Sequence, residues 1–146
     1  MGRIVDVGAK QAVPREAEAR GKLLLQERTL RAIREGKLEK GDALAAAQVA
    51  GLLAVKRTPD LLPLCHPIPL SGATCDLAVG DDGVEARVVA RATHTTGVEM
   101  DALTGCAVAL LTVWDMVKSL EKDAHGQYPA TRLTDLRVVR KEKGGP

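Results

Sequence analysis

The sequence predicts an α+β protein with an antiparallel sheet. Residues 73–79 and 84–93 alternate between the two faces of a strand, and Gly80-Asp81-Asp82-Gly83 between them is a turn sequence, so together they predict a β-hairpin. Residues 97–121 carry the strongest helical pattern, which is expected to lie across the sheet. Strands in two groups with helices between them are typical of a ferredoxin-like sandwich, with helices packed on one face of the sheet. At 146 residues the chain is expected to form one domain, residues 1–146.

The N-terminal segments are less regular. Residues 4–7, Ile-Val-Asp-Val, predict a short strand or an extended arm. Residues 15–26 fit either a charged helix or an exposed strand, and both interpretations stay open. The apolar spacing from Thr29 to Glu35 predicts a short helix, with Thr29 as its N-cap and Gly36 at its end.

Two more elements complete the expected fold. Asp42 is a good N-cap, and a helical stripe of small residues continues from it to Lys56. Small side chains allow a neighbouring element to approach closely. Residues 132–140 predict a closing strand, followed by a basic tail at 141–146. The longest uncharged run, Ala102 to Trp114, is too short to span a bilayer and is interpreted as part of a buried helix.

A proline-rich connector, residues 56–67, separates the helical pattern from the hairpin. Proline biases the residue before it toward extended geometry, so Thr58, Leu62 and His66 are expected to be non-helical. Such a connector is either a stiff turn, whose Cys65 and His66 fill core space, or one wall of a functional site.

The composition narrows the function classes. The formal net charge is only +2, so an anion would have to be bound by a local cluster of cations. One Trp, one Tyr and no Phe leave few rings for base stacking, which disfavours a nucleic-acid binder. The three cysteines include no C-x-x-C pair, and no apolar signal segment is present. We therefore expect a cytoplasmic protein without nucleic-acid or membrane partners.

Asp115 and Lys118 on the long helix are the first candidate for chemistry. They lie three residues apart on one flank, and an ordinary surface salt bridge is one interpretation. The other is a helix that lines a pocket, because a partly buried Asp beside a Lys can hold the amine charged or exchange a proton with it. The core stripe expected beside this flank consists of Leu103, Ala107, Leu110, Trp114 and Val117.

Other candidates lie near helix ends and in the connector. Glu99 and Asp101 in the first helical turn either complement the helix dipole or accept hydrogen bonds from a ligand such as a pterin or guanine. Lys40, just before a helix N-terminus, is either a solvated lysine or part of a phosphate site. Lys56 and His66 can also bind phosphate, so the set is typical of a polyphosphate pocket. Further cations are Arg57, Lys141 and Lys143.

A zinc site is the rival interpretation of four of these side chains, Cys65, His66, Cys75 and His94. Cys65 and His66 are adjacent and would diverge in an extended chain, and neither C-x-x-C nor H-x-E accompanies them. The chain also contains no G-x-S-x-G elbow and no Walker or dinucleotide glycine pattern. We expect no metal and no cofactor, while assistance by Mg²⁺ is left open.

The motifs resemble those of the molybdenum cofactor biosynthesis protein C family. The resemblance extends from Ile4 to about Lys141. The tail departs from the family's Lys-x-Gly-Gly-Lys-Ser-Gly pattern, so its site lysine corresponds to Lys141 or to Lys143. The matching motifs are the opening at 1–7, Lys40-Gly41-Asp42, Lys56-Arg57-Thr58 through Leu64-Cys65-His66-Pro67, and the helix residues 96–104 and 114–118.

The resemblance implies a lyase that converts 3′,8-cyclo-7,8-dihydroguanosine 5′-triphosphate into cyclic pyranopterin monophosphate and pyrophosphate. The implied catalytic residues are Asp115, Lys118 and Lys40, with the lysines moving protons and Asp115 partnering Lys118. The implied substrate-binding residues are Lys56, Leu64, Cys65, His66, Glu99, Met100, Asp101 and Lys141.

The resemblance also implies a homohexamer, a trimer of dimers with sites at the dimer interface, in which Lys40 and Lys118 could come from different subunits. Two other classes remain as rivals: a ferredoxin-like RNA-binding module and a non-catalytic nucleotide or metal sensor. An RNA module should bind with a steep salt dependence, whereas a sensor should bind the nucleotide without turning it over.

Overall fold

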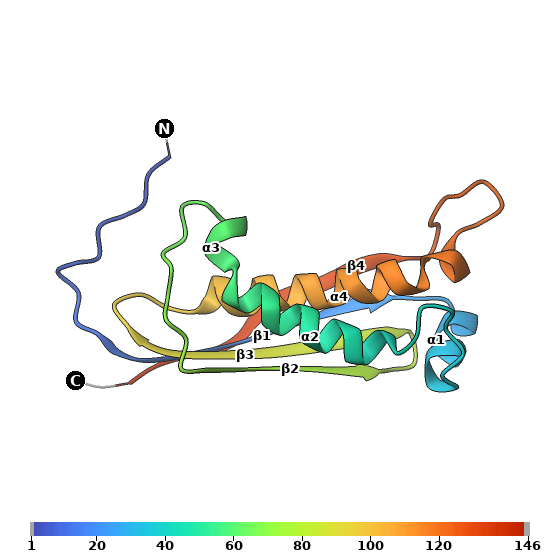
Figure 1. The fold of residues 1–146 in the computed structure, drawn as a ribbon, viewed down its shortest axis with the longest axis horizontal. Helices are drawn as coiled ribbons and strands as arrows, with labels where there is room; N and C mark the ends of the chain where they lie inside the picture. Colours follow the sequence, from blue (N-terminus) through green and yellow to red (C-terminus); the bar gives the residue numbers. More distant parts are fainter. Residues whose placement is uncertain (1, 145–146) are drawn as a thin grey trace.

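Four strands form one antiparallel sheet in the order β2-β3-β1-β4, with helices on one face (Figure 1). The computed structural model describes residues 2–144, so Met1 of the opening motif and the last two residues of the expected tail lie outside the described residues. This order confirms the predicted α+β, ferredoxin-like arrangement. The elements are β1 (Val13–Leu24), α1 (Glu27–Arg34), α2 (Ala43–Lys56), α3 (Thr58–Leu61), β2 (Gly72–Val79), β3 (Gly83–His94), α4 (Glu99–Glu121) and β4 (Arg132–Lys143).

The predicted hairpin and both outer strand patterns are confirmed. β2 and β3 pair from Gly72 opposite Arg91 to Val79 opposite Val84. The undecided segment 15–26 is largely strand β1, and it lies inside the sheet between β3 and β4 rather than at an exposed edge. The closing strand continues to Lys143, so the first residues of the expected tail belong to β4.

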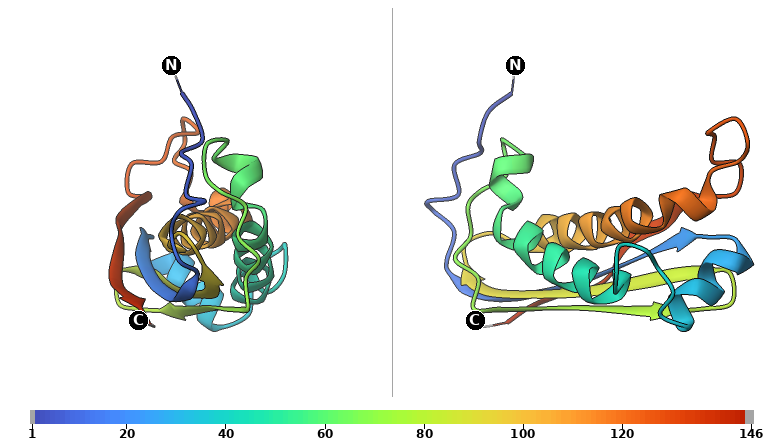
Figure 2. Two further views of the ribbon diagram at one scale, coloured as in Figure 1. Left: turned by 90° about the vertical axis from the view of Figure 1, so that its left-hand side faces the viewer. Right: turned by 45° about the vertical axis from the view of Figure 1, so that its right-hand side comes forward.

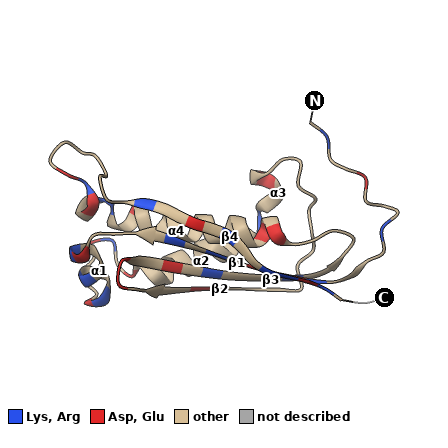
Figure 3. Cartoon of the chain, turned by 180° about the vertical axis from the view of Figure 1, so that it is seen from behind, with Lys and Arg blue, Asp and Glu red and all other residues tan. Residues whose placement is uncertain are grey.

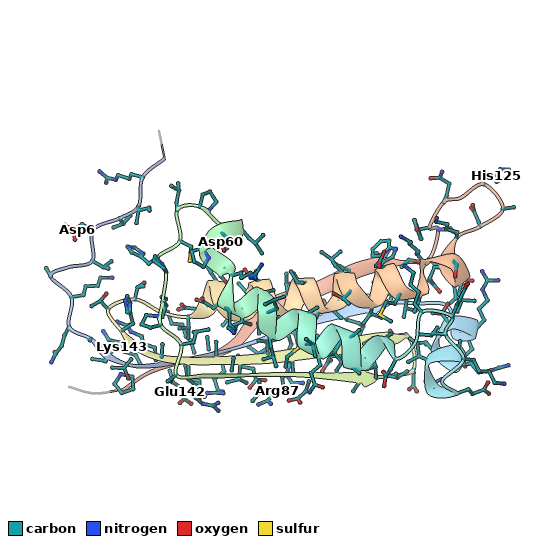
Figure 4. The ribbon with its side chains drawn as sticks, viewed as in Figure 1. Asp6, Asp60, Arg87, His125, Glu142 and Lys143 are labelled. Atoms are coloured by element: carbon teal, nitrogen blue, oxygen red, sulfur yellow. The ribbon has the colours of Figure 1, made fainter. Side chains whose placement is uncertain are left out.

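Ion pairs between neighbouring strands lie on the face of the sheet that carries no helix, and Figure 3 marks the positions of Lys, Arg, Asp and Glu along these strands. Glu18 of β1 is only 6% exposed, because arginines from neighbouring strands surround its carboxylate. Hydrogen bonds from Arg87 and then Arg20 lower the pKa of Glu18 to about 2. Arg87 and Glu142 point away from the helices on this face (Figure 4). The alternation of β1 therefore sends charges outward and small apolar side chains toward the helices.

The helical layer is built on the close contact of α2 with α4, which run in opposite directions across the sheet (Figures 1 and 2). A Cβ atom at Gly105 would lie 2.3 Å from Val55 Cγ2, and one at Gly51 would lie 2.7 Å from Cys75 Sγ. The predicted role of small residues in α2 is thus confirmed. Asp42 caps α2 as expected, because its Oδ1 accepts a hydrogen bond from Ala45 N at 3.0 Å.

Two local expectations are wrong. Thr29 does not cap α1, which begins two residues earlier after Gln26; its buried hydroxyl instead donates to Glu121. Thr58 is helical, because Pro59 occupies the first turn of α3, where a missing N–H is tolerated. Leu62 and His66 are non-helical, as predicted.

The core face of α4 is rotated from the expected stripe. Leu110 and Val117 are buried as predicted, but Leu103, Ala107 and Trp114 are only half-buried. By length and composition α4 could cross a membrane, yet in this fold its apolar side chains pack against the sheet and α2. The buried residues of α4 are Asp101, Ala102, Gly105, Cys106, Ala109, Leu110, Val113, Val117 and Glu121.

Candidate functional site

Lys40, Asp115 and Lys118 come together in one chain and form an acid–base cluster. Lys118 Nζ lies 2.8 Å from Asp115 Oδ1, and Lys40 Nζ lies 3.3 Å from Asp115 Oδ2. Lys40 precedes the N-terminus of α2, and the packing of α2 on α4 brings it to a residue 75 positions away. Within one chain, Lys40 and Lys118 therefore contact the same carboxylate.

The electrostatics of this cluster favour the ionised pair. The hydrogen bond from Lys118, followed by that from Lys40, lowers the pKa of Asp115, and Asp115 in turn raises the pKa of Lys118. The Asp115 side chain is 59% exposed, so the expectation of a partly buried carboxylate is wrong for the isolated chain. Asp115 can thus hold Lys118 as a charged proton donor at the surface.

The connector forms one wall of a second feature, a pocket of about 490 Å³ at the other end of α4. We call it the connector pocket. The start of α4 supplies the opposite wall, where Met100 is exposed beside Glu99. The alternative of a turn whose Cys65 and His66 only fill core space is wrong, because both side chains line this pocket. Its lining residues are Leu62, Pro63, Leu64, Cys65, His66, Ile68, Thr96, Gly97, Glu99 and Met100.

An ion pair joins the connector pocket to the end of β4. Lys141 Nζ lies 2.5 Å from Glu99 Oε1. Burial raises the pKa of Glu99, but the hydrogen bond from Lys141, a backbone hydrogen bond, and the charges of Lys141 and Arg15 together outweigh it, so the pKa lies below its ordinary value. Lys143 instead lines a neighbouring hollow of about 250 Å³ with Lys10 and Arg15. Lys141 is thus the tail lysine that contacts Glu99.

Asp101 lies behind this pocket. Its side chain is 2% exposed, and Oδ2 has no hydrogen-bond partner among the described residues. Burial, followed by the charge of Glu99, raises the pKa of Asp101 to about 6. The pKa of the Cys65 thiol is raised by burial and then by Asp101. Cys65 is therefore a protonated thiol rather than a nucleophilic thiolate.

His66 and Lys56 complete this end of the molecule. His66 Nε2 lies 2.5 Å from the carbonyl oxygen of Val5 in the N-terminal arm. Because a carbonyl only accepts, Nε2 carries the proton in this contact. Lys56 is exposed at the C-terminal end of α2, which lies near the start of α4 because the two helices run in opposite directions.

The acid–base cluster and the connector pocket are too far apart to serve one small substrate within a single chain. Met100 and Asp115 are fifteen residues apart on α4. At a rise of 1.5 Å per residue, this corresponds to about 22 Å along the helix axis. The structure therefore gathers the predicted catalytic residues at one end of α4 and the predicted binding residues at the other.

Within residues 2–144, no three His, Cys, Asp or Glu side chains gather in a way that could hold a metal ion. Cys75 lies in the apolar core at 1% exposure, and burial raises its pKa to about 11. It therefore does not join Cys65 and His66 at the connector.

The sequence analysis missed Arg15 and Lys10, two basic residues that line the same hollow as Lys143. Arg15 donates to the carbonyl oxygens of His94 and Thr95, just before α4. The alternation of side chains along residues 15–26 could have identified Arg15, but only if this segment had been recognised as a strand. Once residues 15–26 are known to be a strand, Arg15 shares the helix-facing side with Ala17, whereas Glu16 points to the charged face.

A ferredoxin-like sandwich that carries an Asp between two lysines, and a separate pocket with an imidazole and a Glu–Lys pair, belongs to the class of proteins equipped for acid–base chemistry on an anionic ligand. The particular family follows from comparison with known proteins. The chain belongs to the MoaC family, whose model matches residues 4–144. This confirms the resemblance seen in the motifs.

Curated relatives match almost the whole chain. The chain is 57% identical to a probable cyclic pyranopterin monophosphate synthase from Pyrococcus abyssi, over 97% of this chain and 89% of the relative. It is 56% identical to a protein of the same description from Thermococcus kodakarensis, over 97% and 91%. A protein from Methanothermobacter thermautotrophicus, described as a probable cyclic pyranopterin monophosphate synthase accessory protein, is 55% identical over 97% and 89%.

Proposed function

We propose that this chain is a cyclic pyranopterin monophosphate synthase of molybdenum cofactor biosynthesis. Its substrate is 3′,8-cyclo-7,8-dihydroguanosine 5′-triphosphate, and its products are cyclic pyranopterin monophosphate and pyrophosphate. The observation that carries the proposal is the Lys40–Asp115–Lys118 cluster, because this reaction needs positioned proton donors and acceptors. The descriptions of the full-length relatives support the same activity.

The charged side chains of the site are assigned to proton transfer and to phosphate binding. Opening and re-forming a ring requires proton transfer, which Lys40 and Lys118 perform, with Asp115 holding the lysines in place. A ribose-derived hydroxyl attacks the α-phosphorus, the bond to the β-phosphate oxygen breaks, and pyrophosphate leaves. The hydroxyl proton passes to a basic group of the cluster. Lys56 and His66 bind phosphate, where cations stabilise the developing charge.

The connector pocket holds the rest of the substrate in this proposal. Leu64, Cys65 and Met100 supply its apolar and thiol contacts. Glu99 accepts hydrogen bonds from the pterin edge, Asp101 supports it from behind, and Lys141 balances the charge of Glu99. No metal is assigned a step.

A second copy of the chain completes the site. The exposed surface of α2 and α4 between the two half-sites is apolar, with Val49 68% and Leu111 50% exposed. A twofold axis beside Val108, midway between Met100 and Asp115, would pair the two α4 helices in opposite directions. The cluster of each copy would then face the connector pocket of its partner. Three such dimers would make the hexamer that the family resemblance implies.

We also propose a cytoplasmic location. All three cysteines are free, and Cys75 and Cys106 are buried thiols, as expected in a reducing compartment.

The proposal is tested by incubating the purified protein with the cyclised nucleotide and measuring both pyrophosphate and the pterin product. Formation of the two products in equal amounts is expected. Tight binding of the nucleotide without turnover would instead identify a sensor. RNA binding that weakens steeply with salt, without turnover of the nucleotide, would identify an RNA-binding module.

A further inference from the structure

The loop between α1 and α2 (Figure 1), residues 35–42, brings Lys40 to the acid–base cluster. Lys40 Nζ lies 3.3 Å from Asp115 Oδ2 and 3.3 Å from the backbone carbonyl oxygen of Asp115. A lysine side chain is a flexible four-carbon stem, and nothing in the stem itself selects one orientation. The position of the amine at Asp115 therefore depends on how the backbone of the loop is held.

Two anchors hold this loop on either side of Lys40. Leu38 is partly buried against the hydrophobic core, and its carbonyl oxygen accepts a hydrogen bond from Gly41 N at 3.1 Å. Asp42 caps α2 by accepting a hydrogen bond from Ala45 N at 3.0 Å. Lys40 is thus the third residue of a tight turn, residues 38–41, that is fixed to the core at one end and to a helix at the other.

Gly41 closes this turn with a backbone conformation that other residues rarely adopt. Its φ is +102°, where the Cβ atom of an L residue clashes with the backbone. Lack of space is not the constraint, because a Cβ atom built at Gly41 would meet no atom within 4 Å among residues 2–144. Gly41 lines an open hollow of about 660 Å³ between α1, α2 and β2. A methyl group at this position would therefore act through the backbone conformation alone.

We propose that Gly41 is a positioning residue for Lys40. Its positive φ lets the turn run directly into the Asp42 cap and thereby directs the lysine side chain to Asp115. A residue that cannot keep this conformation shifts the backbone of the turn, so that Lys40 loses its contact with Asp115. Lys118 reaches Asp115 from the same helix and stays in place. This inference rests on the proposed catalytic role of Lys40.

Gly41→Ala tests the proposal, and Gly126→Ala is its matched control. Gly126 closes a turn in the same way: its φ is +75°, its N–H donates to Asp123 O at 3.0 Å, and its Cβ would also meet no atom within 4 Å among the described residues. Both variants should therefore lose a similar amount of melting temperature. Only Gly41→Ala should lose turnover, by about 10- to 100-fold, with KM changed less than about twofold. Gly41→Asn should lose less, because Asn adopts a positive φ more readily than Ala.

A measurement independent of turnover is the ¹³Cγ NMR titration of Asp115, whose signal is identified by its loss in Asp115→Asn. Lys118 and then Lys40 lower the pKa of Asp115, so Gly41→Ala should raise this pKa and Gly126→Ala should leave it unchanged. In a Lys40→Ala background, Gly41→Ala should change neither the titration nor the turnover any further, because the glycine acts only through the lysine.

An unchanged titration of Asp115 in Gly41→Ala would overturn the proposal, whatever the turnover, and so would an equal loss of turnover in Gly126→Ala. If the wild-type protein does not turn over the cyclised nucleotide, the proposed function fails. The titration of Asp115 alone then decides whether Gly41 positions Lys40.

Discussion

Asp115 is the residue on which the proposed chemistry depends most, because it contacts both lysines and raises the pKa of Lys118. Helical spacing was enough to pair Asp115 with Lys118, since residues three apart face the same side. It could not supply Lys40, which lies 75 positions away and reaches Asp115 only through the packing of α2 on α4. Only the family resemblance connected Lys40 with this pair in the sequence.

We expect Lys40→Ala, Lys118→Ala and Asp115→Asn each to lower turnover by about 10²- to 10⁴-fold while the fold and the oligomer are retained. All three side chains are exposed in the chain, so their removal leaves no cavity. Pyrophosphate release and circular dichroism check the two parts of this expectation. Lys37→Ala, which removes a 73% exposed lysine outside the cluster, should have no effect. Wild-type turnover in any of the three variants removes that residue from the mechanism.

Asp101 predicts a pH dependence of stability. Burial raises its pKa from 3.8 in the unfolded chain to about 6, so the folded state binds the proton more tightly. The free energy of unfolding should therefore fall as the pH rises from about 4 to 6 and level off above that, by up to about 3 kcal/mol from this group.

Asp101→Asn, a neutral side chain of the same shape, should be more stable than wild type at pH 8, and this difference should shrink as the pH falls toward 4. Urea unfolding of both proteins across this range measures the difference between their free energies of unfolding. The contributions of the other carboxylates are the same in both proteins and cancel in this difference. A difference that does not change with pH would show that Asp101 is already ionised in the folded protein.

Among the elements, the close approach of α2 and α4 determines where Lys40 lies. Alanine at Gly105 would gain about 1 kcal/mol from helix propensity. Its Cβ, however, would lie 2.3 Å from Val55 Cγ2 and 3.1 Å from the carbonyl oxygen of Gly51.

We therefore expect Gly105→Ala to lower the free energy of unfolding by about 1–2 kcal/mol, since overpacking outweighs propensity. Thermal unfolding monitored by circular dichroism measures this change. Its sign shows whether overpacking or helix propensity is the larger effect. A stabilised variant would mean that the two helices have room for a methyl group.

The sequence patterns predicted elements best where local signals agreed. The hairpin, the Asp42 cap and the long helix were predicted because alternation, turn residues and helical period each pointed to one structure. The helical conformation of Thr58 was missed because Pro59 is tolerated in the first turn of α3. The cap was wrongly placed at Thr29 because its own sequence does not show that its hydroxyl donates to the distant Glu121. The register of β1 also depends on its two neighbours, which its own sequence does not reveal.

For the molecule as a whole, the pattern of elements predicted the α+β, ferredoxin-like class, but it did not predict the division of the site. The spacing along α4 already separates Met100 from Asp115 by about 22 Å. Only the structure, however, shows that Lys40 contacts Asp115. It also shows that Lys141 and the connector lie at the other end of α4, beside Glu99. Under the proposed function, the two half-sites on one chain, with an apolar helical surface between them, become one site when a second copy of the chain binds there.

This arrangement is tested by mixing two inactive variants, Lys118→Ala from the acid–base cluster and His66→Ala from the connector pocket. If each site combines one half from each subunit, a heterodimer contains one doubly altered site and one intact site. Random exchange of subunits should then restore about one quarter of wild-type turnover. A mixture that stays inactive, although mass spectrometry shows that the subunits have exchanged, would contradict a site shared between two copies of the chain.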